Sequence, residues 1–157
     1  FRLYDPKEEE VPDFRNNPGF YLYQGLDDEY APCDSTNIDI HPSVTKIKDS
    51  AFCGCKRLTK CTMGDNVITI GQGAFAFCKS LKVLCLSRSL RCISDLAFES
   101  CSTIDGVFLP SSMEEIKVGA FRDCTSLRIL LLPATIDLER VGHRIVHDCP
   151  SLLTGSV

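Results

Sequence analysis

The sequence predicts an α/β repeat solenoid of about five 23-residue coils, each combining a short strand with a helical turn. Three observations carry this prediction. A pentad of the form Ala-Phe-x-x-Cys recurs at constant spacing, an apolar-x-apolar triplet follows each pentad, and further apolar columns keep the same phase. Self-similarity at a period of roughly 20–50 residues is the signature of a solenoid. No single coil can bury its apolar face alone, so stacking the coils creates one continuous core.

Residues 1–36 precede the repeats and lack their phase. They hold nine acids against three bases, with four aromatic residues from Phe14 to Tyr23. The aromatics argue against a wholly disordered segment. We therefore expect an acidic, aromatic arm and cap over 1–36 and a solenoid over 37–157, with the stretch FYLY covering the first coil because solenoid ends need covering. The stretch before about residue 18 has three interpretations: a solvated tail, a docking segment for a basic partner, or a segment lying over its own solenoid.

Each coil begins with a predicted strand. Apolar residues that alternate with outward residues indicate strands with a period of two. Stacked in register, the strands predict a parallel sheet on the concave face of the solenoid. The strand triplets are Ile38–Ile40, Cys61–Met63, Leu84–Leu86, Val107–Leu109 and Leu130–Leu132. The final stretch SLLTGSV aligns with SLRILLL, which predicts an open strand edge over residues 155–157.

The pentads predict the convex side. In a helical turn, Phe and Cys are three apart and Ala and Cys are four apart, so all three share one face. We therefore expect short helical turns there. The pentad cysteines are Cys55, Cys78, Cys101 and Cys124, spaced by 23 residues, and Cys149, which follows 25 residues later. We interpret them as small buried hydrophobes stacked in a ladder, with disulfides between coils and metal ligation as alternatives. Free thiols favour a reducing intracellular or organellar compartment, with the cell surface as the alternative.

Catalytic and metal chemistry find weak support. His143 and His147 have a metal-ligand spacing on a helix, but they occupy variable positions of the repeat, where exposed side chains are expected. Cys85 is an outward residue without a histidine on its face, so a nucleophile–base pair is missing. We predict that the chain is not an enzyme and needs neither a cofactor nor a metal.

Charge is segregated along the chain. Residues 1–36 carry −6, residues 37–94 carry +6 and residues 95–157 carry −4. Charge that is segregated in this way influences which charged partners a protein attracts. The basic zone from Lys56 to Arg91 does not indicate nucleic acid, because the net charge is −4 and no recognition motif accompanies it. No apolar run approaches the ~20 residues of a membrane span, and a small-molecule ligand is not expected.

The outward residues of the strands predict a protein-binding face. In the early coil these residues are polar, as a solvated sheet face requires, whereas the later coils place apolar residues there. A contiguous apolar patch across three neighbouring strands usually marks an interface, and a central Phe is a suitable anchor. The predicted protein-binding residues are Val83, Phe108, Ile129, Leu131, Lys60, Thr62 and Cys85. The alternative is that residues 1–36 fold back and cover this patch.

The stretch LKVLCLSRSLRCISDLAFESC resembles the BspA-type, or treponemal-type, leucine-rich repeats. The resemblance covers about residues 37–152, with Pro110 and Pro133 in the proline slot of the repeat, and HPSVTKIKDSAF is similar to the opening coil of versions from diatoms and related microbes. Departures are the longer last unit, Cys61 in place of the usual Val, and the missing prolines at two coils, where Gly64 and Ser87 stand. The resemblance implies a curved leucine-rich-repeat solenoid that binds other macromolecules and has no shared active site.

These observations lead to one functional hypothesis and its rivals. We expect a non-catalytic protein–protein interaction module with a protein partner, acting as a subunit or docking element of a larger assembly. The alternatives are a surface adhesion or carbohydrate-binding module and a purely structural spacer.

Overall fold

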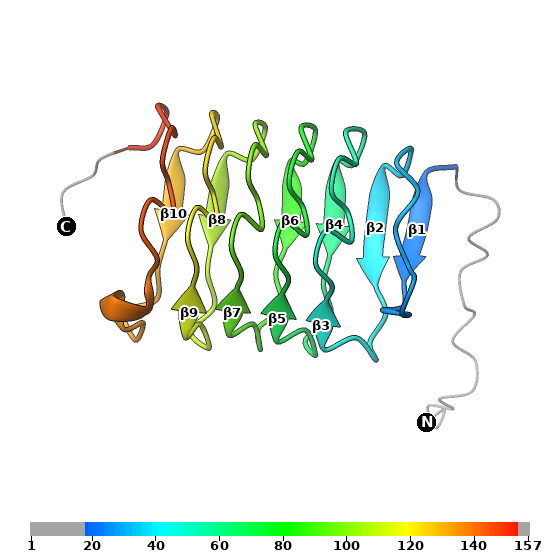
Figure 1. The fold of residues 1–157 in the computed structure, drawn as a ribbon, viewed down its shortest axis with the longest axis horizontal. Coiled ribbons are helices and arrows are strands. Elements are labelled where there is room, and N and C mark those ends of the chain that lie inside the picture. The colour runs from blue at the N-terminus through cyan, green and yellow to red at the C-terminus, as the bar shows by residue number, and fades with distance from the viewer. Residues whose placement is uncertain (1–17, 154–157) are drawn as a thin grey trace, which may run out of the picture.

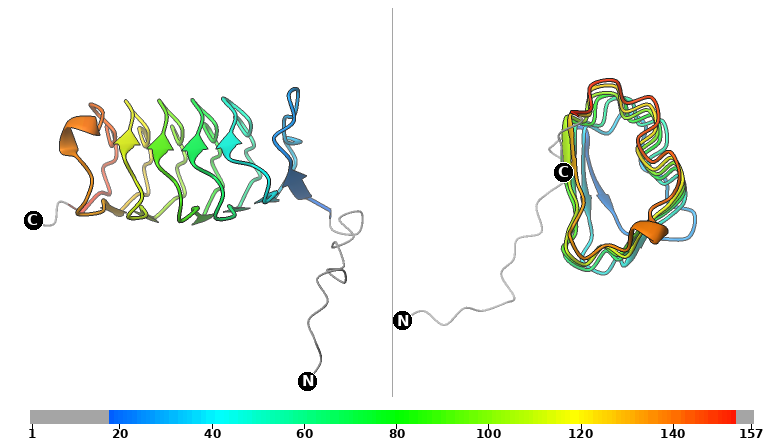
Figure 2. Two further views of the ribbon diagram at one scale, coloured as in Figure 1. Left: turned by 90° about the horizontal axis from the view of Figure 1, so that it is seen from below. Right: turned by 90° about the vertical axis from the view of Figure 1, so that its left-hand side faces the viewer.

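A computed structural model describes residues 18–153, and the chain forms a parallel β-solenoid there (Figure 1). Four complete turns carry one front strand and one back strand each, and a fifth, less regular turn follows. The front strands are β1 (Phe20–Tyr23), β2 (Asn37–Ile40), β4 (Lys60–Thr62), β6 (Val83–Cys85), β8 (Gly106–Phe108) and β10 (Ile129–Leu131). The back strands are β3 (Lys46–Ile47), β5 (Thr69–Ile70), β7 (Cys92–Ile93) and β9 (Glu115–Ile116). The coils follow one another in a nearly straight row (Figure 2).

The strand register equals the sequence repeat. Lys60 lies opposite Val83 in the front sheet and Ile47 lies opposite Ile70 in the back sheet, 23 residues apart in each case. The back sheet runs without a break from β3 to β9, and a single bridge from Ile116 to Val141 extends it. The front sheet consists of two parts, β1-β2-β4-β6 and β8-β10. The predicted parallel solenoid with a repeat of about 23 residues is confirmed.

The helical turns, and with them the α/β class, are not confirmed, because residues 18–153 contain no α-helix. The pentads form a ridge on the side of the solenoid opposite the front sheet. Along this ridge, N–H groups bond alternately to the next coil and within their own coil. The N–H of Phe75 bonds to Ala97 O in the next coil at 2.8 Å, whereas the N–H of Cys78 closes a turn onto Phe75 O at 3.2 Å. An α-helix would need each N–H for a carbonyl four residues earlier in its own coil. A single 3-10 helix, η2 (Leu138–Arg140), is the helical element of these residues.

Left-handed residues separate the ridge turns. Phe77, just before the pentad cysteine, has φ of 62°, and Leu96, just before the pentad alanine, has φ of 55°. A residue with positive φ ends a right-handed helix, because its backbone lies outside the right-handed helical region. Non-glycine residues pay about 1–2 kcal/mol for the left-handed conformation. The same two positions are left-handed in every coil: Ser50, Gly73, Leu96, Gly119 and Arg144, and Gly54, Phe77, Ser100, Asp123 and Asp148.

An aromatic ladder fills the core. The rings of Phe75 and Phe98 stack with centroids 5.1 Å apart, and those of Phe98 and Phe121 stack at 5.2 Å. Tyr23 closes the ladder with its edge against Phe52 at 5.0 Å. All five rings are fully buried. Aromatic pairs at this spacing add about 0.5–1.5 kcal/mol each beyond their buried area, so the ladder stabilises the stacking of the coils that carry a pentad Phe.

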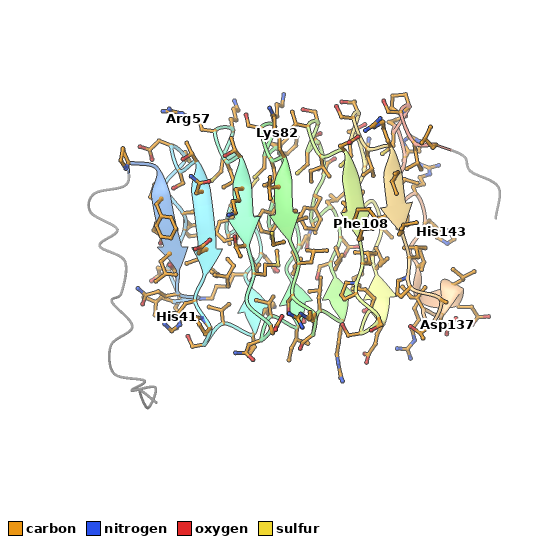
Figure 3. The ribbon with its side chains drawn as sticks, turned by 180° about the vertical axis from the view of Figure 1, so that it is seen from behind. His41, Arg57, Lys82, Phe108, Asp137 and His143 are labelled. Atoms are coloured by element: carbon orange, nitrogen blue, oxygen red, sulfur yellow. The ribbon has the colours of Figure 1, made fainter. Side chains whose placement is uncertain are left out.

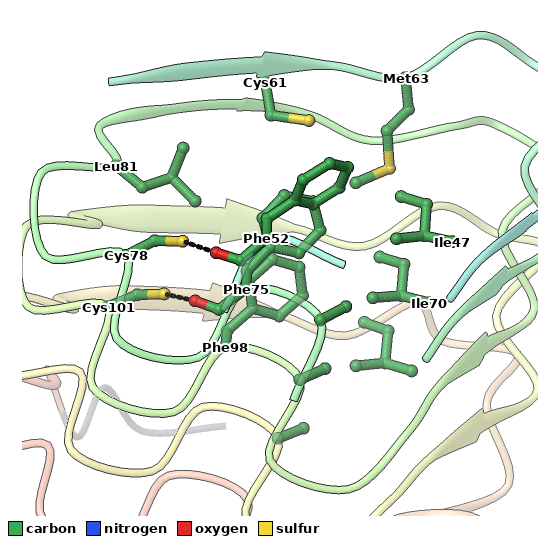
Figure 4. Packing of buried hydrophobic residues seen from close by; sticks show 14 of the residues in the cluster. Ile47, Phe52, Cys61, Met63, Ile70, Phe75, Cys78, Leu81, Phe98 and Cys101 are labelled. Carbon is green, nitrogen blue, oxygen red and sulfur yellow. Dashed lines mark hydrogen bonds between the residues drawn. The ribbon is translucent and has the colours of Figure 1, made fainter. Parts of the chain in front are cut away.

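The pentad cysteines pack in the core and also form hydrogen bonds between coils. The thiol of Cys78 donates to Phe52 O and that of Cys101 donates to Phe75 O, each at 3.1 Å (Figure 4). All ten cysteines are free. Burial raises the pKa of Cys55 to about 11 and that of Cys124 to about 12. Four of the five pentad thiols are buried, but Cys149 is only half-buried because no described coil covers it.

Candidate protein-interaction face

The front sheet turns four large apolar side chains outward. The exposed fractions are 47% for Val83, 65% for Phe108, 41% for Ile129 and 53% for Leu131. Each sits at an outward position of its strand, and Phe108 stands on the front face (Figure 3). The other residues of the predicted site lie on the same sheet: Lys60 and Cys85 are exposed, and Thr62 is half-buried.

Strands β8 and β10 hold the apolar residues side by side. Leu131 lies opposite Phe108, and Ile129 lies opposite Gly106. The inward residue between them on β8, Val107, is buried. Paired parallel strands are about 4.8 Å apart, so the outward side chains of Phe108 and Leu131 are in contact range of one partner residue.

Gly106 shapes this face, although it is not among the predicted protein-binding residues. A Cβ atom at Gly106 would stand 3.7 Å from the ring of Phe108 and 3.9 Å from the Cβ of Ile129. Gly106 therefore contributes no side chain to the outward column between Val83 and Ile129, and the ring of Phe108 lies at contact distance from that position. A glycine in a strand often marks a close approach of another group, and that was the available sequence signal.

The apolar patch formed by Val83, Phe108, Ile129 and Leu131 is divided by the break in the front sheet. In the front sheet, one carbonyl of a coil accepts two consecutive N–H groups from the next coil. Thr36 O, Thr59 O and Asp105 O each do so, but none of the described residues repeats this at Lys82 O, the carbonyl at the same position of its coil. Val83 consequently pairs only with Lys60 on β4, while Phe108 pairs with β10. The expected three neighbouring strands are therefore two hydrogen-bonded strands and a separate third. The constant 23-residue register gives no sign of this break.

The described part of the amino-terminal segment lies away from the patch. Strand β1 pairs with β2 at the opposite end of the front sheet from β10 (Figure 1). Residues 18–36 thus leave Phe108 and Leu131 uncovered. The expected covering by residues 1–17 lies outside the described residues, and the division expected at residue 36 stays a prediction.

Other candidate chemistry is dispersed. His143 and His147 are both exposed, and His147 Nδ1 lies 2.6 Å from Asp148 Oδ2. Over residues 18–153 no group of three or more His, Cys, Asp or Glu side chains could hold a metal ion. Within the same range no helix is long and apolar enough to cross a membrane. An open cleft of about 260 Å³ near the first coil is lined by Asp27, Glu29, Tyr30, Lys46, Lys48 and Asp49.

Comparisons with known proteins agree with the repeat. The family described as the BspA type leucine rich repeat region matches residues 27–153 in six copies. The leucine-rich repeat protein of T. pallidum is similar, with a TM-score of 0.72 and 25% identity over 85% of this chain and 62% of that chain. A leucine-rich repeat protein from Bacteroides capillosus is 34% identical, with a TM-score of 0.57 over 66% of this chain and 78% of that chain.

A third structure extends the likeness in fold alone. A leucine rich cell surface protein from Faecalibacterium prausnitzii has a TM-score of 0.66 and 24% identity, over 88% of this chain and 47% of that chain. The chain thus spans 62% of the treponemal protein and 47% of the cell surface protein. No curated protein matches the chain.

Proposed function

Because the chain belongs to the BspA-type leucine-rich-repeat family, we propose that it is a protein-interaction module that holds its partner on the front sheet. Repeats of this family generally serve protein interaction or adhesion, and their fold is generally non-catalytic. In this proposal the chain acts as a subunit or docking element of a larger assembly.

The exposed apolar residues on the front sheet are the observation that supports the proposal. Phe108 is 65% exposed and Leu131 is 53% exposed, although both stand on paired strands in a well-packed fold. Apolar side chains clustered on a monomer usually mark a binding surface. A glycine in a strand permits the close approach of another group, so a partner can approach the backbone of β8 at Gly106, beside the ring of Phe108.

Paired substitutions test this proposal. Phe108→Ser with Leu131→Ser removes the two most exposed apolar residues of the face. Val118→Ser with Leu138→Ser is the matched control, since these residues are 49% and 71% exposed outside the front sheet. Wild type and both variants are used to capture proteins from native cell extract, and the retained proteins are quantified by mass spectrometry. We expect a partner that wild type and the control variant retain and the face variant loses.

A photoreactive amino acid at position 108, compared with one at position 138, then shows whether the partner touches the front sheet. The thermal midpoint of both double variants should stay close to that of wild type, because exposed side chains change stability by only about 0.5 kcal/mol. Retention of the same proteins by the face variant would reject this face as the binding site. Outright unfolding of that variant would show that the residues are structural.

A surface adhesion or carbohydrate-binding role is the second candidate. It is favoured by the likeness to the F. prausnitzii protein, which is described as a cell surface protein. The ten free thiols favour the interaction module instead, because oxidising compartments promote disulfides. Glycan binding that survives the Phe108→Ser and Leu131→Ser pair would favour adhesion through another surface. A spacer would bind neither proteins nor glycans.

A further inference from the structure

A basic rim runs along one edge of the front sheet. It consists of five exposed residues from two neighbouring coils: Lys56, Arg57, Lys60, Lys79 and Lys82. None of them forms an ion pair within 4.0 Å with a described acid, whereas Arg128 on the same edge is paired with Asp105. The described acids include Asp34, which lies one coil before Arg57 in the repeat register but is not ion-paired with it. The rim is therefore a surface of positive charge without a counter-charge bound to it.

The rim is built by the repeat register. The residue that follows each pentad cysteine is Lys56 or Lys79 in these coils, but Ser102 or Thr125 in the later ones. Lys82 likewise occupies the position that Thr59 holds one coil earlier, as the bond from Lys82 N–H to Thr59 O shows. Stacking places side chains of equal position about 4.8 Å apart, so the lysines concentrate charge that the fold does not use.

The chain enters the solenoid at this same edge. Thr36 donates its N–H to Gly19 O at 2.7 Å, Thr59 donates to Thr36 O, and Lys82 donates to Thr59 O. Gly19 therefore begins the row of residues that ends at Lys82. Figure 3 shows Arg57 and Lys82 along the edge at which the described chain begins beside β1.

We propose that residues 1–17 dock on the basic rim of their own solenoid through the acidic stretch from Glu8 to Asp13. This stretch, EEEVPD, holds four acids and no base, against five bases on the rim. Opposite charges at this density attract across water, and the attraction is screened by salt. The complementary charge and the shared edge make residues 1–17, here called the acidic arm, the occupant of the rim.

The length of the arm permits this contact. An extended chain covers at most about 3.3–3.6 Å per residue, so Glu10 can reach about 30 Å from Gly19. Lys82 lies three strand spacings from Gly19, or about 14 Å. Short tethers give effective concentrations in the millimolar range, which allows several weak ion pairs to hold the arm. The docked arm reaches the end of the patch at Val83, which lies opposite Lys60.

Zero-length carbodiimide cross-linking of the full chain tests the proposal without a partner. The reagent joins carboxylates to lysine amines that are in contact, and peptide mapping by mass spectrometry locates the joints. We expect cross-links from Glu8–Glu10 to Lys56, Lys60, Lys79 and Lys82 within single chains. Lys46, Lys48 and Lys117, which lie away from the rim, serve as internal controls. The yield should fall several-fold between about 20 mM and about 500 mM salt, because the Debye length shortens.

An arginine variant keeps every reactive group in place. Arg57→Gln removes a rim charge without adding a carboxylate, and Arg88→Gln makes the same change at the exposed pair of Arg88 with Asp65. Arg57→Gln should lower the rim cross-links several-fold, and Arg88→Gln should not. Joints that form only between two chains, that spread evenly over all lysines, or that are unchanged by salt and by Arg57→Gln would each overturn the proposal. The test does not touch the apolar patch, so its outcome is independent of the proposed function.

Discussion

The two ends of the solenoid differ in how they close the core. At the amino-terminal end, Tyr23 is fully buried against Phe52, and Cys55 is buried as well. At the carboxy-terminal end, the last pentad carries Ile145 and Val146 in place of Ala and Phe, and both are half-buried. The same repeat is therefore sealed at one end and exposed at the other end of the described chain.

Hydrogen-bond polarity explains why the two ends need different caps. On the ridge, each coil directs N–H groups to carbonyls of the next coil, as Phe98 does to Ala120 O. The first coil thus presents carbonyls, and Ala31 N–H caps one of them, Ala51 O, at 3.3 Å. The last coil presents donors. The N–H groups of Arg144, Val146 and Asp148 have no backbone acceptor among residues 18–153. A cap for this end must supply carbonyls.

The largest expected contrast is between an interior rung and the end rung of the core. Phe98→Ala should lower the free energy of unfolding by about 3–5 kcal/mol, because it leaves a cavity between two stacked rings. Val146→Ala, at the same pentad position in the half-buried last coil, should cost less than about 1.5 kcal/mol. Urea denaturation followed by circular dichroism measures both values. Equal losses would mean that the last coil is packed as tightly as the interior.

Thiol labelling under native conditions should show the same contrast. Burial raises the pKa of Cys101 well above its ordinary value, so that thiol becomes reactive only when the coil opens. Burial raises the pKa of Cys149 too, but this thiol is only half-buried. We expect Cys149 to react at least about a hundredfold faster than Cys101. Rapid labelling of Cys78, Cys101 and Cys124, or disulfides among them, would contradict the buried ladder.

The sequence predicts the stack better than the local backbone. Phase alone identifies the inward residues, since Phe75 and Ile70 are buried at the expected positions. Phase cannot distinguish a helical turn from a series of tight turns, because both place Phe and Cys on one side. Phe77, an aromatic residue in the left-handed region, shows that stacking rather than intrinsic preference sets the ridge conformation.

The candidate site follows from the same alternation, with two exceptions. The outward positions of Phe108 and Leu131 can be predicted from a period of two. The break beside Lys82 cannot, because it depends on hydrogen bonds between coils rather than on side-chain phase. The role of Gly106 cannot either, because the neighbours of its missing side chain are known only once β8 and β10 are paired.

A smaller effect is expected from the hydroxyl of the amino-terminal cap. Tyr23 accepts a hydrogen bond from Lys48 N–H at 3.3 Å, and it is the only ring of the described ladder that is not Phe. Tyr23→Phe should lower the free energy of unfolding by about 1 kcal/mol, since the Lys48 N–H loses its partner while the ring remains. Tyr30→Phe, at an exposed ring, is the control. If both variants unfold at the same urea concentration as wild type, the hydroxyl does not stabilise the cap.

The smallest expected effect concerns Glu29, which holds the loop of the same cap. Its carboxylate accepts N–H bonds from Gln24 and Leu26 at 2.8–3.0 Å and the hydroxyl of Tyr21 at 2.8 Å. Burial acts to raise the pKa of Glu29, but these donors outweigh it and hold the pKa below its ordinary value of about 4.5. The folded state therefore binds the proton more weakly than the unfolded state. The resulting stability is complete above about pH 4.5 and is lost as the pH falls through the lowered pKa.

Glu29→Gln removes this charge and isolates its effect. At pH 7 the variant should be less stable than wild type by no more than about 1 kcal/mol, because the site is partly exposed and screened. The difference should shrink as the pH falls through the lowered pKa of Glu29, because the wild-type carboxyl then becomes protonated. Asp28→Asn makes the same charge change on an exposed neighbour and should show little difference at either pH. Urea denaturation at several pH values measures both gaps. A Glu29→Gln gap that stays constant with pH would show that the shape of the side chain, rather than its charge, anchors the cap.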